Sequence, residues 1–267
     1  MWEGLSKSER RYLWNGVGSA VAIVAAVVGL WASPLSPVWM DSGAVKAGDG
    51  DPAAALEAYL DQSDWGPASR RGESLWRAAV LADVHLDQPG RSMALLEQLI
   101  ETLPEHERVA DAHARVAQIH RLHHQDPVRA GTRWVAAASV APHHPQAGRW
   151  MLDAGMAFAE AGDLARANTA LDRAAVRPDQ AVAARLAQGR LHLRSAPAKA
   201  YADYDAAYRA GASGEAKRLA QLGMATALEY LDRREQALAE LEDARDEGVT
   251  DAALQRRRDR LWARRSN

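Results

Sequence analysis

The pattern of apolar and charged positions divides the chain into two parts. Residues 12–40 contain no Asp, Glu, Lys or Arg, whereas charged residues are spread evenly along the rest of the chain. After residue 40, apolar residues recur with helical spacing, and no run of alternating β-branched residues marks a strand. The pattern predicts an all-α protein that is preceded by an uncharged, largely apolar N-terminal segment.

Residues 13–32 are predicted to form a single transmembrane helix. At ~1.5 Å per residue, this segment matches the ~30 Å hydrocarbon core of a bilayer. Trp14 and Trp31 stand near its two ends, where indole rings favour the headgroup region. Residues 33–40 are then a linker. A cleaved signal peptide and a buried helix of a globular domain are the two alternatives for the same segment.

The basic residues around this segment predict its orientation. Lys7, Arg10 and Arg11 precede it, whereas the first basic residue after it is Lys46. By the positive-inside rule, residues 1–12 form a cytoplasmic tail and the chain after residue 40 lies outside the cytoplasm.

A recurring pair of positions marks one helix face in the rest of the chain. A small residue is followed four positions later by a large apolar residue, at intervals of 33 to 38 residues. This spacing predicts a helix in each unit, with the small residue where another helix crosses it closely. The six copies are Ala55/Tyr59, Ser92/Leu96, Ala130/Trp134, Ala167/Leu171, Ala200/Tyr204 and Ala237/Leu241.

Each unit is expected to begin with another helix, because a further small residue stands 12 or 13 positions before the first. This earlier helix is the first helix of the unit. Proline, glycine and aspartate separate the two helices of a unit and close the unit after them. The earlier small residues are Gly43, Ala79, Ala117, Gly155, Ala187 and Ala225. We expect five helix pairs, and a sixth if the region around Gly43 is not the exit of the membrane helix.

This pattern resembles the tetratricopeptide repeat, a helix pair of ~34 residues. The residues that fall on the family's positions in the best copy, residues 148–178, are Met151, Ala154, Gly155, Phe158, Gly162, Ala167, Leu171, Ala174 and Pro178, with the proline one position early. The resemblance implies an α-solenoid over residues 41–248, with a shared core and a concave groove lined by the first helix of each pair. Residues 249–267 are then a basic capping helix and tail.

The resemblance also implies that the groove binds other proteins. Few lysines and asparagines are available to clamp a terminal carboxylate, whereas Met and Trp suit an apolar or helical segment. The residues expected to line the groove are Trp76, Val80, Asp83, Asp111, Gln118, Arg149, Leu152, Met156, Arg185, Leu222, Thr226 and Tyr230.

Composition argues against several classes of function. The chain has no cysteine, which excludes disulfides and thiolate metal sites, and its net charge of -2 argues against a nucleic-acid binder. No catalytic or phosphate-binding motif is present, so we expect neither an enzyme nor a cofactor. His120 and His124 have the spacing of two metal ligands, but packing or surface histidines are the preferred interpretation, and no metal site is predicted.

The sequence therefore predicts a membrane-tethered scaffold or adaptor with a periplasmic or otherwise extracytoplasmic solenoid. The layout looks like that of bacterial envelope proteins of this family, which places it in the inner membrane with other membrane-complex subunits as partners. The alternative is a permanent structural subunit of one large membrane complex. The arginine-rich C-terminal helix is either a solvated cap or a contact with lipid or an acidic partner.

Overall fold

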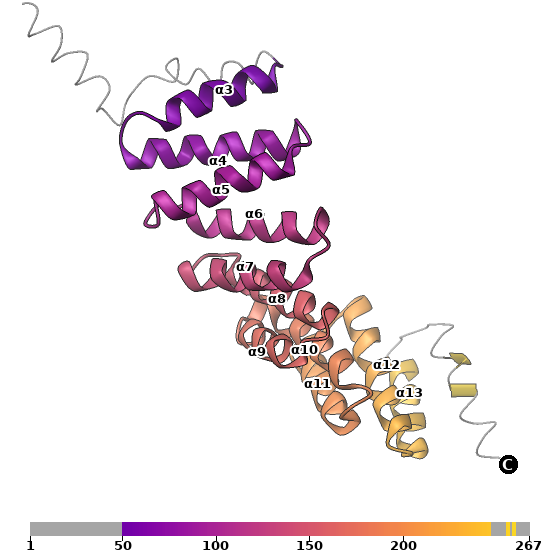
Figure 1. The fold of residues 1–267 in the computed structure, drawn as a ribbon. Helices are drawn as coiled ribbons and strands as arrows, with labels where there is room; N and C mark the ends of the chain where they lie inside the picture. The colour runs from indigo at the N-terminus through magenta and orange to yellow at the C-terminus, as the bar shows by residue number, and fades with distance from the viewer. Residues whose placement is uncertain (1–49, 247–254, 257, 260–267) are drawn as a thin grey trace, which may run out of the picture. The chain divides into compact units, whose positions relative to one another are not determined.

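The computed structural model describes residues 50–246, 255, 256, 258 and 259 of the 267-residue chain (Figure 1). In this part every regular element is a helix and none is a strand, which confirms the predicted all-α fold there. No helix among these residues is long and apolar enough to cross a membrane.

The predicted N-terminal elements lie outside the described residues. These are the tail at 1–12, the transmembrane helix at 13–32 and the linker at 33–40. Most of the predicted capping helix at 249–267 lies outside them as well. These four assignments stay predictions from the sequence.

Short turns join eleven helices in the described part. Their bounds are α3 (Pro52–Ser63), α4 (Ala68–Val84), α5 (Pro89–Thr102), α6 (Val109–Leu122), α7 (Pro127–Val140), α8 (Ala147–Glu160), α9 (Leu164–Ala175), α10 (Pro178–His192), α11 (Pro197–Arg209), α12 (Gly214–Tyr230) and α13 (Arg234–Asp246).

The order of the helices follows the predicted pairing. The pairs are α4 with α5, α6 with α7, α8 with α9, α10 with α11, and α12 with α13. The remaining helix, α3, carries Ala55 and Tyr59 and is therefore the second helix of the predicted first unit. The region around Gly43, where its first helix was expected, precedes the described residues.

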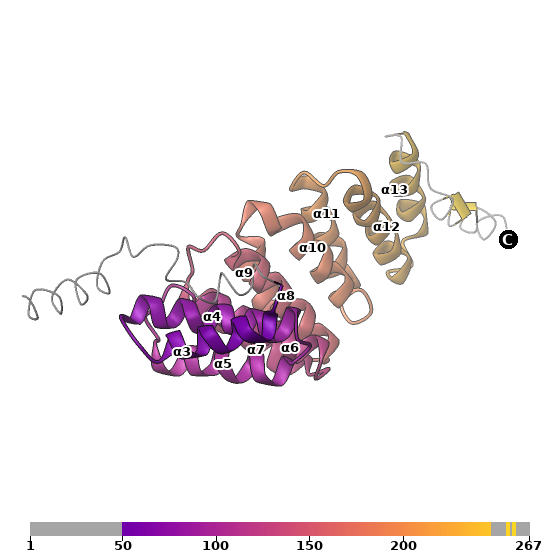
Figure 2. The same ribbon diagram turned by 90° about the horizontal axis from the view of Figure 1, so that it is seen from above.

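The helices belong to two compact units, residues 1–108 and 109–267. In the first unit, α4 packs between α3 and α5. In the second, each helix from α6 to α13 packs on the next, and α10 also contacts α8 and α12 (Figure 2). The first helices α8, α10 and α12 therefore lie beside one another in the second unit.

Small residues at the crossings let the helices approach closely. A methyl group added to Gly155 on α8 would lie 2.6 Å from Cγ of Leu171 on α9. The ring of Tyr204 on α11 fits between two glycines, since methyl groups on Gly189 and Gly223 would lie 2.7 and 2.6 Å from it. The ten residues expected at crossings in these pairs, Ala130, Trp134, Gly155, Phe158, Ala167, Leu171, Ala200, Tyr204, Ala237 and Leu241, are all buried.

Aspartate side chains begin several second helices. Asp126 Oδ1 accepts a hydrogen bond from the backbone N–H of Arg129 at 2.9 Å, and Asp163 Oδ1 accepts one from that of Arg166 at 3.0 Å. Each bond satisfies a backbone N–H that has no partner within the helix, which fixes where the helix starts.

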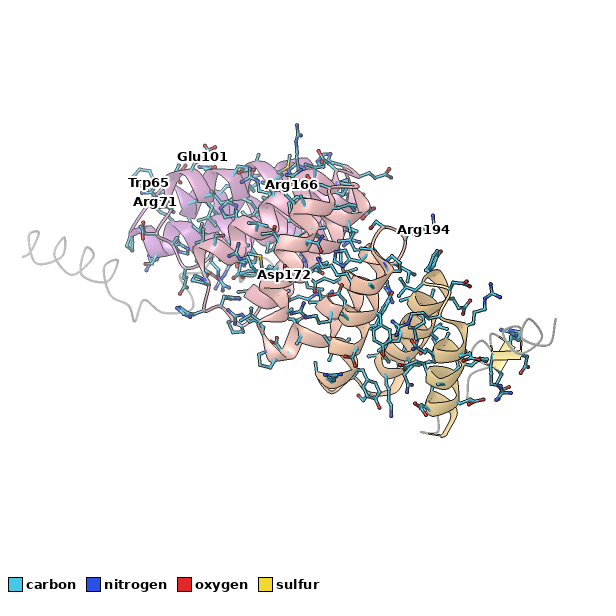
Figure 3. All side chains as sticks on the ribbon, turned by 90° about the horizontal axis from the view of Figure 1, so that it is seen from below. Trp65, Arg71, Glu101, Arg166, Asp172 and Arg194 are labelled. Atoms are coloured by element: carbon cyan, nitrogen blue, oxygen red, sulfur yellow. The ribbon has the colours of Figure 1, made fainter. Side chains whose placement is uncertain are left out.

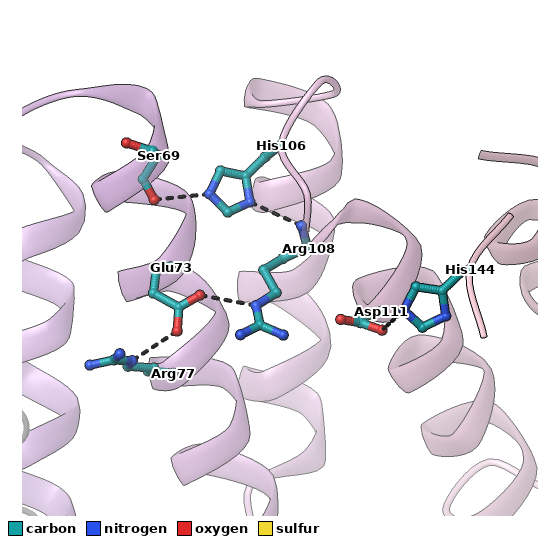
Figure 4. A network of polar contacts seen from close by, with 7 residues as sticks. All are labelled: Ser69, Glu73, Arg77, His106, Arg108, Asp111 and His144. Atoms are coloured by element: carbon teal, nitrogen blue, oxygen red, sulfur yellow. Dashed lines mark hydrogen bonds and ion pairs between the residues drawn. The ribbon is translucent and has the colours of Figure 1, made fainter. Parts of the chain in front are cut away.

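A histidine lies in the turn after the second helix in two consecutive pairs. In the first unit, the backbone N–H of Arg108 donates to His106 Nδ1 at 3.1 Å, so the proton on Nε2 is directed at the carbonyl oxygen of Ser69, 2.9 Å away (Figure 4). In the second unit, the backbone N–H of Gln146 donates to His144 Nδ1 in the same way, at 3.2 Å. In both units the imidazole accepts a hydrogen bond from the backbone of its own turn and so stabilises that turn. In the first unit it also connects the turn to the start of α4.

We expect the substitution Gly155→Ala to destabilise the protein by about 1–3 kcal/mol, because the added methyl group overpacks a fully buried contact with Leu171. The matched control is Gly90→Ala on α5, where nothing lies within 4 Å of the added group. That variant should be neutral or gain up to about 1 kcal/mol from helix propensity. Urea unfolding followed by circular dichroism measures both, and equal midpoints would contradict the packing argument.

Candidate functional site

A hollow of about 570 Å³ opens between α8, α9 and α10, within the second unit. Eight of its lining residues are apolar and the other two are arginines. The lining consists of Arg149, Leu152, Met156, Ala159, Leu171, Ala183, Leu186, Ala187, Arg190 and Leu191.

Helical periodicity explains how two helices supply most of this lining. The four lining residues of α8 are three or four positions apart. The five of α10, at positions 183, 186, 187, 190 and 191, are separated by one or three positions in turn, which is also the spacing of one helix face. Each set therefore lies on one face of its helix. Because α8 and α10 are neighbouring first helices, these two faces flank the same space. Leu171 of α9 is fully buried beneath them.

The lining residues differ in depth. Leu152 and Leu186 are buried, with 4% and 7% of their surface exposed, whereas Met156 is 41% exposed. The leucines therefore form the base of the hollow and the methionine forms part of its rim. An exposed, unbranched methionine can adapt its shape to an incoming apolar group.

The two arginines differ in their partners. Arg149 Nε lies 3.0 Å from Oδ2 of Asp153, one turn later on α8. Arg190 is exposed and forms no ion pair with any carboxylate among the described residues; its charge acts on the phenol of Tyr204, where burial raises the pKa and Arg190 opposes that shift. Arg190 is thus the guanidinium at this site that has no carboxylate partner among the described residues.

The arginines mark opposite ends of the hollow. Arg149 is near the start of α8 and Arg190 is near the end of α10. Helices joined by short turns run antiparallel, so α8 and α10, with α9 between them, run in the same direction. One positive group therefore lies at each end of an apolar surface.

Arg185 was expected in the groove but does not line the hollow. Its Nη1 donates to Oε1 of Gln188 at 2.9 Å and lies 3.7 Å from Oδ1 of Asp172 on α9. The amide of Gln188 donates to the same carboxylate at 2.8 Å. Arg185 therefore holds α10 against α9, beside the hollow.

The other expected groove residues also lie on first helices but do not line the hollow. In the first unit, Trp76, Val80 and Asp83 are half-buried on α4, and the guanidinium of Arg108 lies 5.6 Å from the centroid of the Trp76 ring. In the second unit, the remaining residues are Asp111 and Gln118 on α6 and Leu222, Thr226 and Tyr230 on α12.

Their surroundings vary. Asp111 lies 3.8 Å from His144, the hydroxyl of Thr226 donates to the carbonyl of Leu222 at 2.6 Å, and Tyr230 is more than half exposed. The structure thus brings together Arg149, Leu152 and Met156 out of the twelve expected residues.

The residues that α10 contributes were not expected in the groove, and Ala187 was expected only as a small residue of the repeat. The signal was present, because 183, 186, 187, 190 and 191 have the spacing of one helix face. The repeat around residue 181 departs from the family pattern in its first helix, so this face was not assigned to the groove.

The surroundings of His113 and His120 on α6 lower the pKa of each imidazole. Burial, together with the charge of Arg133 on α7, lowers the pKa of His113 to about 4. Burial also lowers the pKa of His120, whose ring centroid lies 5.6 Å from that of His124. Within the described residues no group of three or more potential metal ligands occurs.

The pKa of His113 predicts a loss of stability in mild acid. The unfolded chain binds a proton below pH 6.5, whereas the folded chain does so only near pH 4, so unfolding takes up a proton between these values. The free energy of unfolding should fall by up to about 3 kcal/mol from this residue as the pH drops from 6.5 to 4. The variant His113→Gln should lose that part of the pH dependence in urea titrations. An unchanged slope, or an NMR titration of the His113 ring near pH 6.5, would refute the assignment.

Comparison with known proteins supports the fold. No protein-family model matches the chain, and no curated protein matches it. The chain is similar to the crystal structure of YrrB, described as a TPR protein with an unusual peptide-binding site, with a TM-score of 0.55, 16% identity, and 74% of this chain and 96% of that chain covered.

Two further structures are similar. The crystal structure of MamA has a TM-score of 0.46 and 15% identity, over 74% of this chain and 99% of that chain. The TPR2AB domain of yeast Sti1, in complex with pHSP90, has a TM-score of 0.39 and 14% identity, over 84% of this chain and 96% of that chain. With the helix pairing described above, the likeness to YrrB shows that the described part has the fold of a tetratricopeptide-repeat solenoid.

Proposed function

We propose that this protein is a scaffold that binds a segment of another protein in the hollow between α8 and α10. The observation that carries the proposal is an apolar surface on adjacent first helices that the described residues leave uncovered, with Met156 exposed at its rim. Concave, mostly apolar hollows of this kind are common binding sites. The fold relative YrrB is described as having a peptide-binding site, which agrees with this use of the fold.

The binding role suits the chemistry of the lining better than catalysis does. The ten residues around the hollow include no carboxylate, histidine, serine or threonine. Arginine is permanently protonated at neutral pH, so it orients or neutralises a bound group but does not exchange a proton with it. Recognition is therefore the role that these side chains can perform.

We also propose that the scaffold is tethered to the bacterial inner membrane by residues 13–32, with the solenoid on the extracytoplasmic side. The support is the uncharged segment of 12–40 and the basic residues that precede it. Its partners are then other subunits of an envelope or inner-membrane assembly. Tethering would hold the hollow near such partners and raise their effective concentration.

Site-specific crosslinking tests the binding surface. A photo-reactive amino acid at Met156, in the rim of the hollow, should crosslink to a defined partner in native membranes. The same group at Leu164 on α9 is the matched control, because Leu164 is 46% exposed and lies outside the hollow. Mass spectrometry should identify one recurrent partner from position 156 and none from 164. Equal products from both positions, or none from 156, would refute the proposed surface.

Protease accessibility tests the tether. In intact spheroplasts, protease added from outside should digest the solenoid, and the protein should stay in the membrane pellet after carbonate extraction. Replacing Val24 and Val27 with arginine should release the protein from the pellet, because a charge at the centre of a span costs about 2.5–3.5 kcal/mol. Protection from the protease would reverse the orientation, and release of the unmodified protein by carbonate would remove the tether.

A further inference from the structure

The lining of the hollow restricts the chemistry of the segment that can bind there. Eight of the ten lining residues are apolar, so a bound segment must present apolar side chains to avoid burying polar groups without partners. Both charged residues of the lining are cations, and Arg149 is already paired with Asp153. Arg190 is left to attract an anionic group from the ligand.

The lining also favours a helical segment over an extended one. An extended peptide needs partners for its backbone N–H and C=O groups, either from a strand edge or from side-chain amides. The described part of the chain has no strand, and the hollow is lined by no Asn or Gln. A helix satisfies its own backbone groups and needs only apolar contacts along one face.

We propose that the hollow binds an amphipathic helix of a partner protein that carries a carboxylate opposite Arg190. Apolar side chains of the helix, three or four positions apart, contact Leu152, Met156 and Leu186. An Asp or Glu at one end of this apolar face pairs with the Arg190 guanidinium. This inference rests on the proposed function and names the chemistry of its partner.

The two kinds of contact have separate roles. The apolar contacts supply most of the affinity, because they remove the Met156 side chain and the apolar side chains of the bound helix from water. The carboxylate selects the register and direction of the helix, because Arg190 lies at one end of the hollow only. A guanidinium accepts a carboxylate in two parallel hydrogen bonds, which adds directional specificity.

The volume of the hollow is large enough to receive a few side chains of a bound helix. Pockets that enclose a small ligand measure roughly 300–1,000 Å³, and the value of about 570 Å³ lies within that range. A fatty acid has the same combination of an apolar body and a carboxylate, so it is the competing ligand that the experiment must separate from a peptide helix.

Selection from a peptide library tests the proposal. The full-length chain in mild detergent is used to select from a phage library in which one face of a helical peptide is randomised. Selected peptides should share apolar residues at helical spacing together with an Asp or Glu at one constant position. Their binding should be lost with the variant Met156→Glu.

The variant Arg190→Gln should keep the apolar preference and lose the acidic one. In fluorescence anisotropy, changing the selected acidic residue to its amide should weaken binding to the wild-type chain about 3- to 10-fold, and should have no effect on the Arg190→Gln chain. Arg190→Glu should select Lys or Arg at the same peptide position. The matched control is Arg194→Gln, an exposed arginine in the turn after α10 and outside the hollow (Figure 3), which should behave like the wild type.

The possible negative results distinguish a failure of the proposed binding surface from a failure of this inference. If no peptide is selected, or if Met156→Glu changes nothing, both the proposed binding surface and this inference are wrong. If apolar peptides are selected without an acidic residue, or if Arg194→Gln acts like Arg190→Gln, the proposed binding surface is supported and the carboxylate assignment is wrong. If decanoate binds in an Arg190-dependent manner and displaces the peptides at micromolar concentration, the ligand is a fatty acid and the peptide proposal is overturned.

Discussion

The close approach of neighbouring helices at glycine and alanine positions is the constraint on which the rest of the structure depends. Leu171 and Tyr204 are too large to lie between helices unless the facing residue has little or no side chain, and Gly155, Gly189 and Gly223 provide that space. Because packed interiors tolerate few voids and little overlap, these pairs set the distance between helices. The spacing of the first helices, and with it the hollow, follows from that distance.

The hollow occurs where the small residues have no large neighbour to accommodate. Ala159, Ala183 and Ala187 line it, and no side chain of the described helices fills the space beside them. At the crossings, by contrast, equally small residues are covered by an aromatic ring or a leucine. The same residue type therefore serves the core in one place and a binding surface in another, depending on what faces it.

Polar contacts hold the helices around the hollow in position. Many ion pairs of the protein are exposed pairs three or four positions apart on one helix, such as Arg149 with Asp153, and such pairs contribute little to stability. The contact of His192 Nδ1 with Asp203 Oδ2 is different, since it measures 2.6 Å and both residues are buried between α10 and α11. A buried polar pair of this kind specifies one arrangement of α10, which forms one side of the hollow.

The sequence by itself determined the helix pairing and the residues at the crossings, because these follow from local spacing. The period of Ala130, Ala167, Ala200 and Ala237 predicted second helices that the structure contains, and the uncharged segment at 13–32 is a property of the sequence alone. Only the tertiary structure decided which of the expected groove residues act together. It joined Leu152 and Met156 to Leu186 and Arg190, while Arg185, equally plausible from its position, turned toward Asp172. The physical reason is that helical spacing is set by the backbone, whereas the space left between two helices depends on every side chain that could fill it.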